Sequence, residues 1–410
     1  MADRAVDFLL IGGGVAAARC ARTLREEGAE GSILLVGREP DPPYDRPPLS
    51  KGYLRGESGR EAALAESPDW WEANGVELLT GTSVMKLDAD GRTAKLSTKE
   101  EVGFDKALLA TGANVRRLRA DGADLDGLHY LRAFGNSDAI REEAAEAERV
   151  VLIGGSYIGC EVAASLTAGL GKHCTILMQE DEVLERTVGP SLAPFFGGIL
   201  REHGVEIHGG DSLDRFEGSD GRVSRVVTEG GLELDCDMVI VGAGVMPDVT
   251  LARSGGLELG EAGGLLCSSG LETSLEGVFA AGDMCEYDSV IHGRPLRLEH
   301  WDVAAEHGKT AARNMLGQGV DHDVVPYFFS DLADWVSLGY VGPGVGEPTI
   351  RGSVDDGSFT AFYLDDGKVT AALAVGDRDA DLDEARRFIK AGSRPDPSAL
   401  ADEGTGLNSL

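Results

Sequence analysis

Apolar and polar positions follow the same order in two separate parts of the chain. Residues 8–11 are four consecutive apolar residues, followed by the glycines 12–14 and by a helical pattern up to about residue 27. A further apolar run covers residues 33–36. Short continuous apolar runs are typical of strands buried on both faces, so this part predicts a parallel strand–helix–strand unit.

The second copy of the pattern begins with an apolar run at residues 150–153. A glycine-rich turn at 154–159, a helix from 160 to about 170 and a strand at 175–177 follow it. Two such units predict an α/β protein with two Rossmann-like dinucleotide-binding domains.

Shorter alternating segments lie between and after the two units. Residues 76–79, 94–97, 205–208 and 223–228 predict strands, which we interpret as β-meander crossovers because turn residues flank them. One amphipathic helix is predicted over residues 302–316.

The pattern changes to short strands with Asp-Gly turns beyond about residue 321, which predicts a small α+β C-terminal domain. Residues from about Ser393 onward look like a loose tail. The predicted domains are therefore 1–114 together with 245–320, then 115–244, then 321–410.

Composition narrows the possible functions. The formal net charge of −32 would repel phosphate backbones and anionic headgroups, which argues against a nucleic-acid or membrane partner. No apolar run approaches the roughly 18–20 residues that span a bilayer. Asp3 and Asp7 stand where a signal peptide carries positive charge, and the glycines 12–14 break the apolar stretch, which argues against a signal peptide. Together with cysteines that are scattered along the chain, this predicts a cytoplasmic protein.

The six cysteines have no metal-ligand or dithiol spacing. They are Cys20, Cys160, Cys174, Cys236, Cys267 and Cys285. Isolated, buried, reduced thiols are the prediction, and neither a zinc site nor a redox-active disulfide is expected.

The first glycine-rich turn has the spacing of a pyrophosphate loop. Gly12, Gly14 and Ala17 match GxGxxA between a strand and a helix, and Glu39 follows the second strand. The first glycine permits the turn, the second admits the pyrophosphate to the backbone N–H groups, and the acidic residue accepts from ribose hydroxyls. A tight turn without a ligand is the alternative.

Three further segments add chemistry. Residues 109–113 place a small, kinked chain at a strand end, and residues 277–283 end a strand in Gly282-Asp283, whose carboxylate can accept from a polyol. Residues 43–51, PYDRPPLSK, place two cations in a stiff, proline-rich loop. Each segment alone is compatible with ordinary turn chemistry.

Together these motifs resemble the FAD-dependent ferredoxin reductases of oxygenase systems, which are putidaredoxin reductase-like members of the pyridine nucleotide-disulfide oxidoreductase superfamily. The resemblance covers roughly residues 6 to 390, and PYDRPPLSK is its most specific part. Apoptosis-inducing factor and the monodehydroascorbate reductases are more distantly similar. The resemblance implies an oxidoreductase that passes electrons from NADH through FAD to a ferredoxin.

The resemblance also implies the binding residues. For FAD they are Gly12, Gly14, Val15, Ala16, Ala17, Glu39, Arg46, Lys51, Val84 (by its backbone, at the adenine), Ala110, Thr111, Gly112, Arg132, Gly282, Asp283, Glu299, His300 and Trp301. For the nicotinamide cofactor they are Gly154, Gly155, Ser156, Tyr157, Ile158, Gly159, Glu161, Glu180 and Gly244.

Lys51 and Glu161 form the catalytic pair that the resemblance implies. In relatives the matching Lys lies beside flavin N5 and pairs with the Glu of the second phosphate helix. A cation there favours negative charge on the reduced ring. A solvated Lys and a helix-surface Glu are the alternative for this pair, and a structural Trp is the alternative for Trp301.

The nicotinamide cofactor is expected to be NADH rather than NADPH. Met178 stands where an acidic residue usually ends the second strand, and Glu180 follows two residues later. A carboxylate accepts from the 2′-hydroxyl and repels a 2′-phosphate, and no Arg lies between Met178 and Glu185. Ser156 replaces the second glycine of the loop, and its Cβ narrows the approach to the pyrophosphate.

The electron acceptor is expected to be external, because the regions where disulfide reductases carry their thiols have none. A [2Fe–2S] ferredoxin or another small iron–sulfur protein that supplies a P450 or Rieske oxygenase is the leading prediction. Residues 326–331 resemble the family's Pro-x-Phe-Trp-Ser-Asp run, with Phe329 in place of Trp.

Ferredoxins are usually acidic, so docking to this acidic chain needs a local Arg patch, for which 116, 117 and 119 or 294 and 297 are candidates. Two alternatives stay open: reduction of a small acceptor such as a quinone, an ascorbyl-type radical or O₂, and an NADH-sensing protein like apoptosis-inducing factor. The sequence leaves monomer and homodimer equally open.

Overall fold

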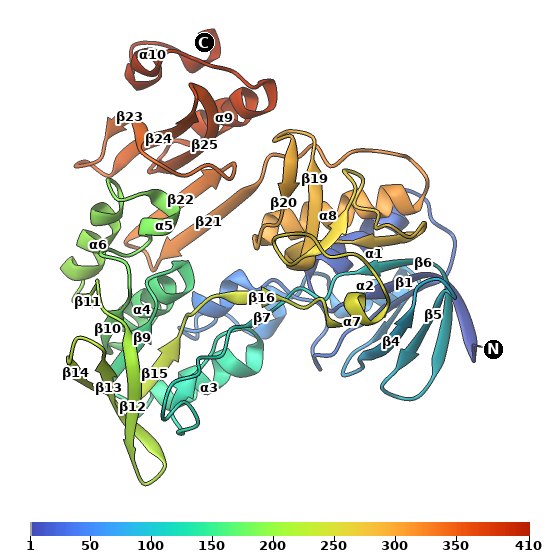
Figure 1. The fold of residues 1–410 in the computed structure, drawn as a ribbon, viewed down its shortest axis with the longest axis horizontal. Helices are drawn as coiled ribbons and strands as arrows, with labels where there is room; N and C mark the ends of the chain where they lie inside the picture. The colour runs from blue at the N-terminus through green and yellow to red at the C-terminus, as the bar shows by residue number, and fades with distance from the viewer. Residues whose placement is uncertain (1) are drawn as a thin grey trace. The chain divides into compact units, whose positions relative to one another are not determined.

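The computed structural model describes residues 2–410, which form two compact units. Unit 1 consists of residues 2–46, Glu61–Asn114 and Val245–Pro326, and unit 2 of Pro47–Arg60, Val115–Gly244 and Tyr327–Leu410 (Figure 1). Unit 2 contains most residues of both the second and the third predicted domain. The division into three domains with the boundaries given above remains a prediction.

A mixed sheet forms the core of unit 1. Its strands are, in spatial order, β3 (Val76–Leu79), β2 (Ile33–Val36), β1 (Arg4–Ile11), β6 (Glu101–Leu109), β5 (Thr93–Leu96) and β4 (Val84–Asp88), with β18 (Val278–Ala280) paired to β6. The strands β1, β2, β3, β6 and β18 run parallel, and β4 and β5 continue the sheet antiparallel. All four residues of β2 are buried, as its continuous apolar run predicts.

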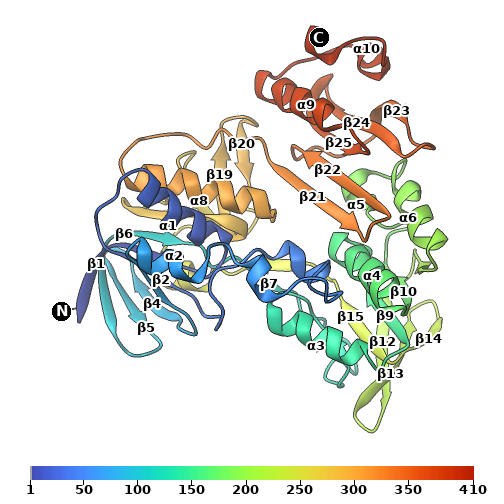
Figure 2. The ribbon, with the colours of Figure 1, turned by 180° about the vertical axis from the view of Figure 1, so that it is seen from behind.

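Two helices lie side by side against this sheet. They are α1 (Val15–Glu26) and α8 (Trp301–Met315), and both views of the ribbon show them together (Figures 1 and 2). Gly308 allows the close approach, because a Cβ at this position would lie 2.2 Å from the carbonyl oxygen of Ala16. The predicted helix over residues 302–316 is thereby confirmed to within a residue.

Smaller elements complete the described part of unit 1. They are α2 (Pro68–Ala73), α7 (Thr250–Ser254), the three-stranded sheet of β17 (Leu265–Cys267), β19 (Cys285–Ser289) and β20 (Arg294–Leu296), and the paired strands β7 (Ala113–Val115) and β16 (Val245–Pro247).

Unit 2 contains a parallel sheet that corresponds to the second predicted dinucleotide-binding fold. Its spatial order is β11 (Glu206–His208), β10 (His173–Leu177), β9 (Arg149–Ile153), β15 (Met238–Val241) and β8 (Leu128–His129). The associated helices are α3 (Phe134–Ala144), α4 (Tyr157–Leu170), α5 (Glu185–Val188) and α6 (Ala193–Glu202), and β12 (Leu213–Ser219), β13 (Arg222–Thr228) and β14 (Glu233–Asp235) form a separate antiparallel sheet.

The prediction of β-meander crossovers is wrong for two of its four segments. Strand β3 pairs parallel with β2, and β11 pairs parallel with β10, each at the edge of a parallel sheet. The helices α2 and α6 return the chain to the same end of the sheet before these strands, which makes them parallel. Strands β5 and β13 pair antiparallel, as predicted.

The C-terminal part of unit 2 is an antiparallel sheet with a helix, which confirms the predicted α+β class. The spatial order of the strands is β21 (Tyr327–Leu332), β22 (Val336–Val341), β25 (Lys368–Val375), β24 (Ser358–Asp365) and β23 (Pro348–Ser353), and α9 (Asp379–Ala391) packs against it.

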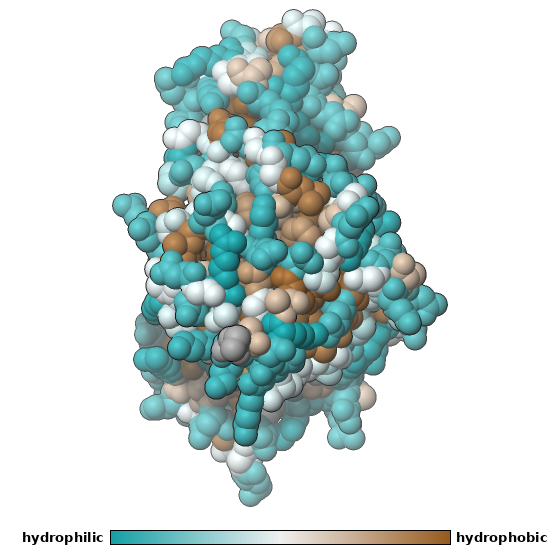
Figure 3. All heavy atoms as spheres, turned by 90° about the vertical axis from the view of Figure 1, so that its right-hand side faces the viewer, coloured by the Kyte–Doolittle hydropathy of each residue, from teal (hydrophilic) through white to brown (hydrophobic). Residues whose placement is uncertain are grey.

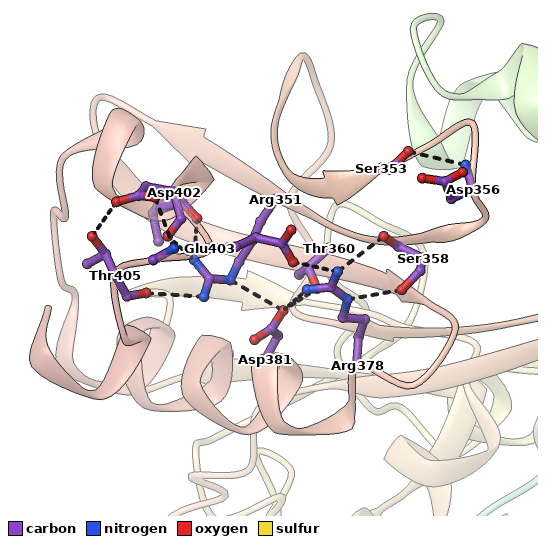
Figure 4. A network of polar contacts seen from close by, with 12 residues as sticks. Arg351, Ser353, Asp356, Ser358, Thr360, Arg378, Asp381, Asp402, Glu403 and Thr405 are labelled. Carbon is purple, nitrogen blue, oxygen red and sulfur yellow. Dashed lines mark hydrogen bonds and ion pairs between the residues drawn. The ribbon is translucent and has the colours of Figure 1, made fainter.

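The prediction of a loose tail after Ser393 is wrong. Helix α10 (Pro397–Ala401) and the turns after it are fixed by Arg351 of β23, which donates to the carbonyl oxygens of Leu400 (3.2 Å), Asp402 (2.6 Å) and Thr405 (3.1 Å) (Figure 4). Leu400 is also buried in the core. These contacts bridge about 50 positions of sequence, which a local pattern does not reveal.

The face shown in Figure 3 is mostly hydrophilic and the cysteines lie in the interior, as the charged composition and the scattered cysteine spacing predict. Hydrophilic residues dominate the face shown in Figure 3, and apolar residues gather near its middle. All six cysteines are buried, as predicted, and none forms a disulfide in the structure. None of the helices in residues 2–410 has the length and hydropathy needed to cross a bilayer, and these residues contain no cluster of three metal-ligating side chains.

We expect Arg351→Ala to release the C-terminal segment. The Arg351 side chain is 9% exposed, and its loss removes three hydrogen bonds at once, for a destabilisation of about 1 to 3 kcal/mol. Limited proteolysis with mass spectrometry should then detect cleavage at peptide bonds within residues 395–410. Arg394→Ala, which removes an exposed ion pair with Asp366, is the matched control, and equal cleavage of both variants would contradict the expectation.

Candidate functional site

The phosphate loop of unit 1 leaves the first turn of α1 open to an anion. Gly12 has a φ of +138°, and a Cβ there would lie 2.0 Å from the carbonyl oxygen of Ala110, so only glycine fits. Gly14 is the N-cap of α1, provides no side-chain cap, and would carry a Cβ with no atom within 4 Å. The first turn has no acidic residue. Uncapped N–H groups beside a glycine with open space around it fit a pyrophosphate.

Three predicted FAD segments meet at the carboxyl ends of neighbouring strands. The last residues of β1 and β18, Ile11 and Ala280, both pair with Leu109 of β6. The loops that follow therefore start together. The Thr111 N–H donates to the sulfur of Met284 at 3.4 Å, so the segments after β6 and β18 are in contact.

Glu39 lies in a polar cluster within unit 1. It accepts hydrogen bonds from Arg46 (2.7 Å) and from the hydroxyl of Tyr44 (2.5 Å). Burial opposes ionisation of Glu39, but Arg46 and Tyr44 outweigh it and lower the pKa of the carboxyl group. Gly81 donates to the carbonyl oxygen of Glu39 at 2.8 Å, which places the segment leading to Val84 beside it.

The residues that precede and begin α8 face the same set of segments. The indole N–H of Trp301 donates to Asp45 Oδ1 at 2.8 Å, and His300 is the N-cap of the helix. Burial lowers the pKa of His300 to about 4, so its imidazole is neutral near pH 7. Glu299 pairs with Arg297 at 2.7 Å, and Arg297 also donates to the carbonyl oxygen of Asp283 at 3.1 Å.

Unit 2 repeats the glycine-rich loop before α4. A Cβ at Gly154 would lie 2.6 Å from the carbonyl oxygen of Gly242, and a Cβ at Gly159 would lie 2.2 Å from that of Gly154. Ser156 is the N-cap but makes no side-chain cap, and no acidic residue lies in the first turn. These N–H groups are likewise available to an anion.

The other predicted residues of this loop lie at the start of α4. The Tyr157 ring packs edge-on against Phe328 with 4.9 Å between centroids, and Ile158 is 44% exposed. Met178 packs beneath the loop, where a Cβ on Gly155 would lie 2.2 Å from its sulfur. Gly244 accepts the backbone N–H of Arg116 at 2.9 Å.

Glu180 has a partner that the sequence analysis missed. It forms an ion pair with Arg186 of α5. The chain turns into α5 at Glu185 and brings the next residue, Arg186, back to the strand end. A cation therefore lies beside this carboxylate, from the residue directly after the Arg-free stretch between Met178 and Glu185.

Lys51 and Glu161 are in direct contact within unit 2. Their ion pair measures 2.7 Å, and Glu161 is 3% exposed. Glu161 also accepts from the hydroxyls of Ser50 (2.5 Å) and Ser330 (2.6 Å). The alternative of a solvated Lys and a helix-surface Glu is wrong. Ser330 was missed, although it lies in the PYFFSD run, and Lys51 Nζ lies 5.5 Å from the ring centroid of Phe329 in that run.

The predicted FAD residues belong to both units. Lys51 and Arg132 are in unit 2, and the others are in unit 1. The backbone N–H of Arg132 donates to the Asn136 side chain at the start of α3. Of the candidate docking arginines, Arg117 lies over the Tyr130 ring at 5.0 Å, whereas Arg297 is engaged inside unit 1.

Comparison with known proteins agrees with this arrangement of two glycine-rich loops. Residues 6–308 match the pyridine nucleotide-disulphide oxidoreductase model, and residues 327–410 match the reductase C-terminal model. The chain belongs to the pyridine nucleotide-disulphide oxidoreductase family. The predicted family and fold class are confirmed. As a member of this family, the chain has FAD and a pyridine nucleotide as its cofactors.

Several relatives match this chain over nearly its whole length. It is 33% identical to a ferredoxin–NAD(P)⁺ reductase of a Sphingomonas species, over 97% of this chain and 96% of the relative. It is also 33% identical to the ferredoxin–NAD⁺ reductase component of the anthranilate 1,2-dioxygenase system of Burkholderia cepacia, over 98% of each. The crystal structure of a covalent putidaredoxin reductase–putidaredoxin complex aligns with a TM-score of 0.92 and 32% identity, over 100% of this chain and 98% of that chain.

Two glycine variants separate folding of the phosphate loop from binding. Gly12→Ala forces a Cβ against Ala110 and should destabilise unit 1 by about 1 to 3 kcal/mol. Gly14→Ala meets no protein atom and should change stability by less than about 0.5 kcal/mol, while weakening FAD binding about tenfold or more. Thermal unfolding of the apoprotein and FAD titration measure the two effects, and equal destabilisation by both variants would contradict the assignment.

Proposed function

We propose that this protein is an NADH-dependent ferredoxin reductase that supplies electrons to an oxygenase. The proposal rests on the two uncapped glycine-rich helix N-termini, one in each unit, together with the names of full-length relatives. When bound, FAD accepts a hydride and can release the two electrons one at a time to a one-electron acceptor.

Unit 1 supplies the residues that would hold FAD. The N–H groups at the start of α1 would bind the pyrophosphate, and Glu39 would accept from the adenosine ribose. Arg46, which Glu39 holds at 2.7 Å, would supply a positive charge to the diphosphate. Asp283 would accept from the ribityl hydroxyls.

Unit 2 supplies the pyridine nucleotide loop and the charged pair. The first turn of α4 would bind the NADH pyrophosphate, and Glu180 would accept from the ribose hydroxyls. Glu161 holds the Lys51 ammonium in one orientation, with Ser50 and Ser330 fixing the carboxylate. We propose that Lys51 thereby presents a fixed positive charge to the flavin.

The cysteines support an acceptor outside the chain. Burial raises the pKa of the Cys20 and Cys160 thiols well above the usual range, and the other four cysteines are buried as well. Buried thiols with raised pKa values are poor nucleophiles and poor electron carriers. Electrons that enter through NADH would therefore leave to a separate protein, as the ferredoxin-linked names of the relatives indicate.

A spectrum and an acceptor comparison test the proposed function. The purified protein should show two visible flavin bands that NADH bleaches under nitrogen. Cytochrome c reduction should be fast only after a [2Fe–2S] ferredoxin is added. Fast turnover with quinone or dyes alone would identify a small-acceptor reductase, and a slow, long-lived reduced complex would identify a sensing protein. Either result would reject the ferredoxin proposal.

Lys51→Ala should slow the bleaching of the flavin by NADH by roughly 10-fold or more, because the charge facing the cofactor is lost. Stopped-flow absorbance measures this rate directly. Lys86→Ala, which removes an exposed lysine on β4, is the control for a simple loss of charge. An unchanged rate in the Lys51 variant would remove this residue from the mechanism.

Coenzyme preference should respond in opposite directions to the two members of the Glu180–Arg186 pair. Glu180→Gln should lower the ratio of kcat/KM for NADH over NADPH by about 10-fold, and Arg186→Gln should raise it, because a cation there attracts the 2′-phosphate. Arg201→Gln, which opens the neighbouring ion pair with Glu182, is the matched control. Unchanged kcat/KM ratios in both variants would show that other residues distinguish the ribose hydroxyl from the 2′-phosphate.

A further inference from the structure

His307 is a fully buried histidine of α8 that the proposed chemistry does not use. Its side chain is 0% exposed, and its Nδ1 accepts the backbone N–H of Gly282 at 3.3 Å. Gly282 stands directly before Asp283, the residue proposed to bind the ribityl chain. A buried polar side chain is therefore bonded to the backbone of a cofactor-binding turn.

The hydrogen bond fixes the protonation of the imidazole. Because Nδ1 accepts, it carries no proton, and the single ring proton is on Nε2. Burial, together with the neighbouring His322, holds the pKa of His307 well below its usual range. The acceptor at Nδ1 is thus present at every pH at which the protein is expected to work.

The rest of the His307 ring is packed against other rings. Tyr287 and His322 lie with ring centroids 4.8 and 4.6 Å away, and both rings are nearly perpendicular to it. Within residues 2–410 the Nε2 atom has no hydrogen-bond partner. Packing between these rings does not itself require a polar atom, whereas the buried N–H of Gly282 requires an acceptor, which His307 supplies.

Gly282 is the point at which strand β18 turns into the binding segment. Its φ is +77°, in the left-handed region, and the three-residue turn Gly282–Met284 begins there. Ala281 still donates to Leu109 in the sheet, at 3.0 Å. The next amide would lack a partner inside the protein without His307, and the direction of that turn decides where Asp283 lies.

We propose that His307 is a positioning residue for FAD: by accepting the Gly282 N–H, it fixes the turn that presents Asp283 to the cofactor. The inference rests on the proposed FAD site of unit 1. It adds a determinant of cofactor affinity that lies behind the binding segment, on the helix that also packs against α1.

Two reciprocal variants separate hydrogen bonding from packing. His307→Phe keeps an aromatic ring between Tyr287 and His322 but removes the acceptor, whereas His307→Asn keeps an acceptor close to the Nδ1 position and removes the ring. We expect the Kd of the apoprotein for FAD, measured by fluorescence quenching, to rise about 10-fold in the Phe variant and less than about threefold in the Asn variant. The FAD-to-protein ratio after purification should fall in parallel.

The opposite order, or equal losses in both variants, would show a packing role and overturn the inference. Normal FAD affinity in the Phe variant would overturn it as well. Circular dichroism of the apoproteins verifies that each variant folds. His322→Phe alters the same ring cluster but keeps the acceptor at His307, so it should change the Kd by less than about threefold. Asp283→Ala distinguishes the two levels of the argument, because normal FAD binding by that variant would reject the proposed site itself.

Discussion

The packing of α8 on α1 is the constraint on which the rest of unit 1 depends. At Gly308 the two helices come so close that a Cβ would lie 2.2 Å from the carbonyl oxygen of Ala16, in the first turn of α1. Any larger residue would push the start of α1 away from the strand ends. The same helix begins after its N-cap His300 and carries Trp301 and His307, so one contact between backbones ties the start of α1 to three of the side chains that would act at or behind the FAD site.

Unit 2 depends in the same way on a single buried carboxylate. Burying Glu161 at 3% exposure costs free energy unless donors replace the lost water. Lys51, Ser50 and Ser330 supply those donors. They come from the proline-rich loop and from β21, far apart in sequence, so the carboxylate also joins the loop and the C-terminal sheet to α4. The charge that would act on the cofactor is therefore also a structural link.

The parts that the sequence predicted are those governed by local physics. Apolar runs and glycine spacing depend on a few neighbouring residues, so the strands β1, β2, β9 and β10 and both loops could be located. Arg351, Ser330 and Arg186 could not, because their partners are set by tertiary folding rather than by spacing. The polar C-terminal stretch resembles a tail in sequence, because its few apolar residues, such as Leu400, are isolated. Only the folded structure shows that Leu400 is buried in a core.

Both carboxylates expected to accept hydrogen bonds from a ribose form an ion pair with an arginine of the same chain. Glu39 pairs with Arg46 and Glu180 with Arg186. A carboxylate beside a guanidinium keeps its oxygen lone pairs, which still accept hydroxyl groups, but its net field is largely cancelled. Recognition of the ribose then depends on hydrogen-bond geometry more than on charge. This cancellation matters most at the proposed pyridine nucleotide site of unit 2. There the paired Glu180 repels a 2′-phosphate less strongly than an unpaired carboxylate would.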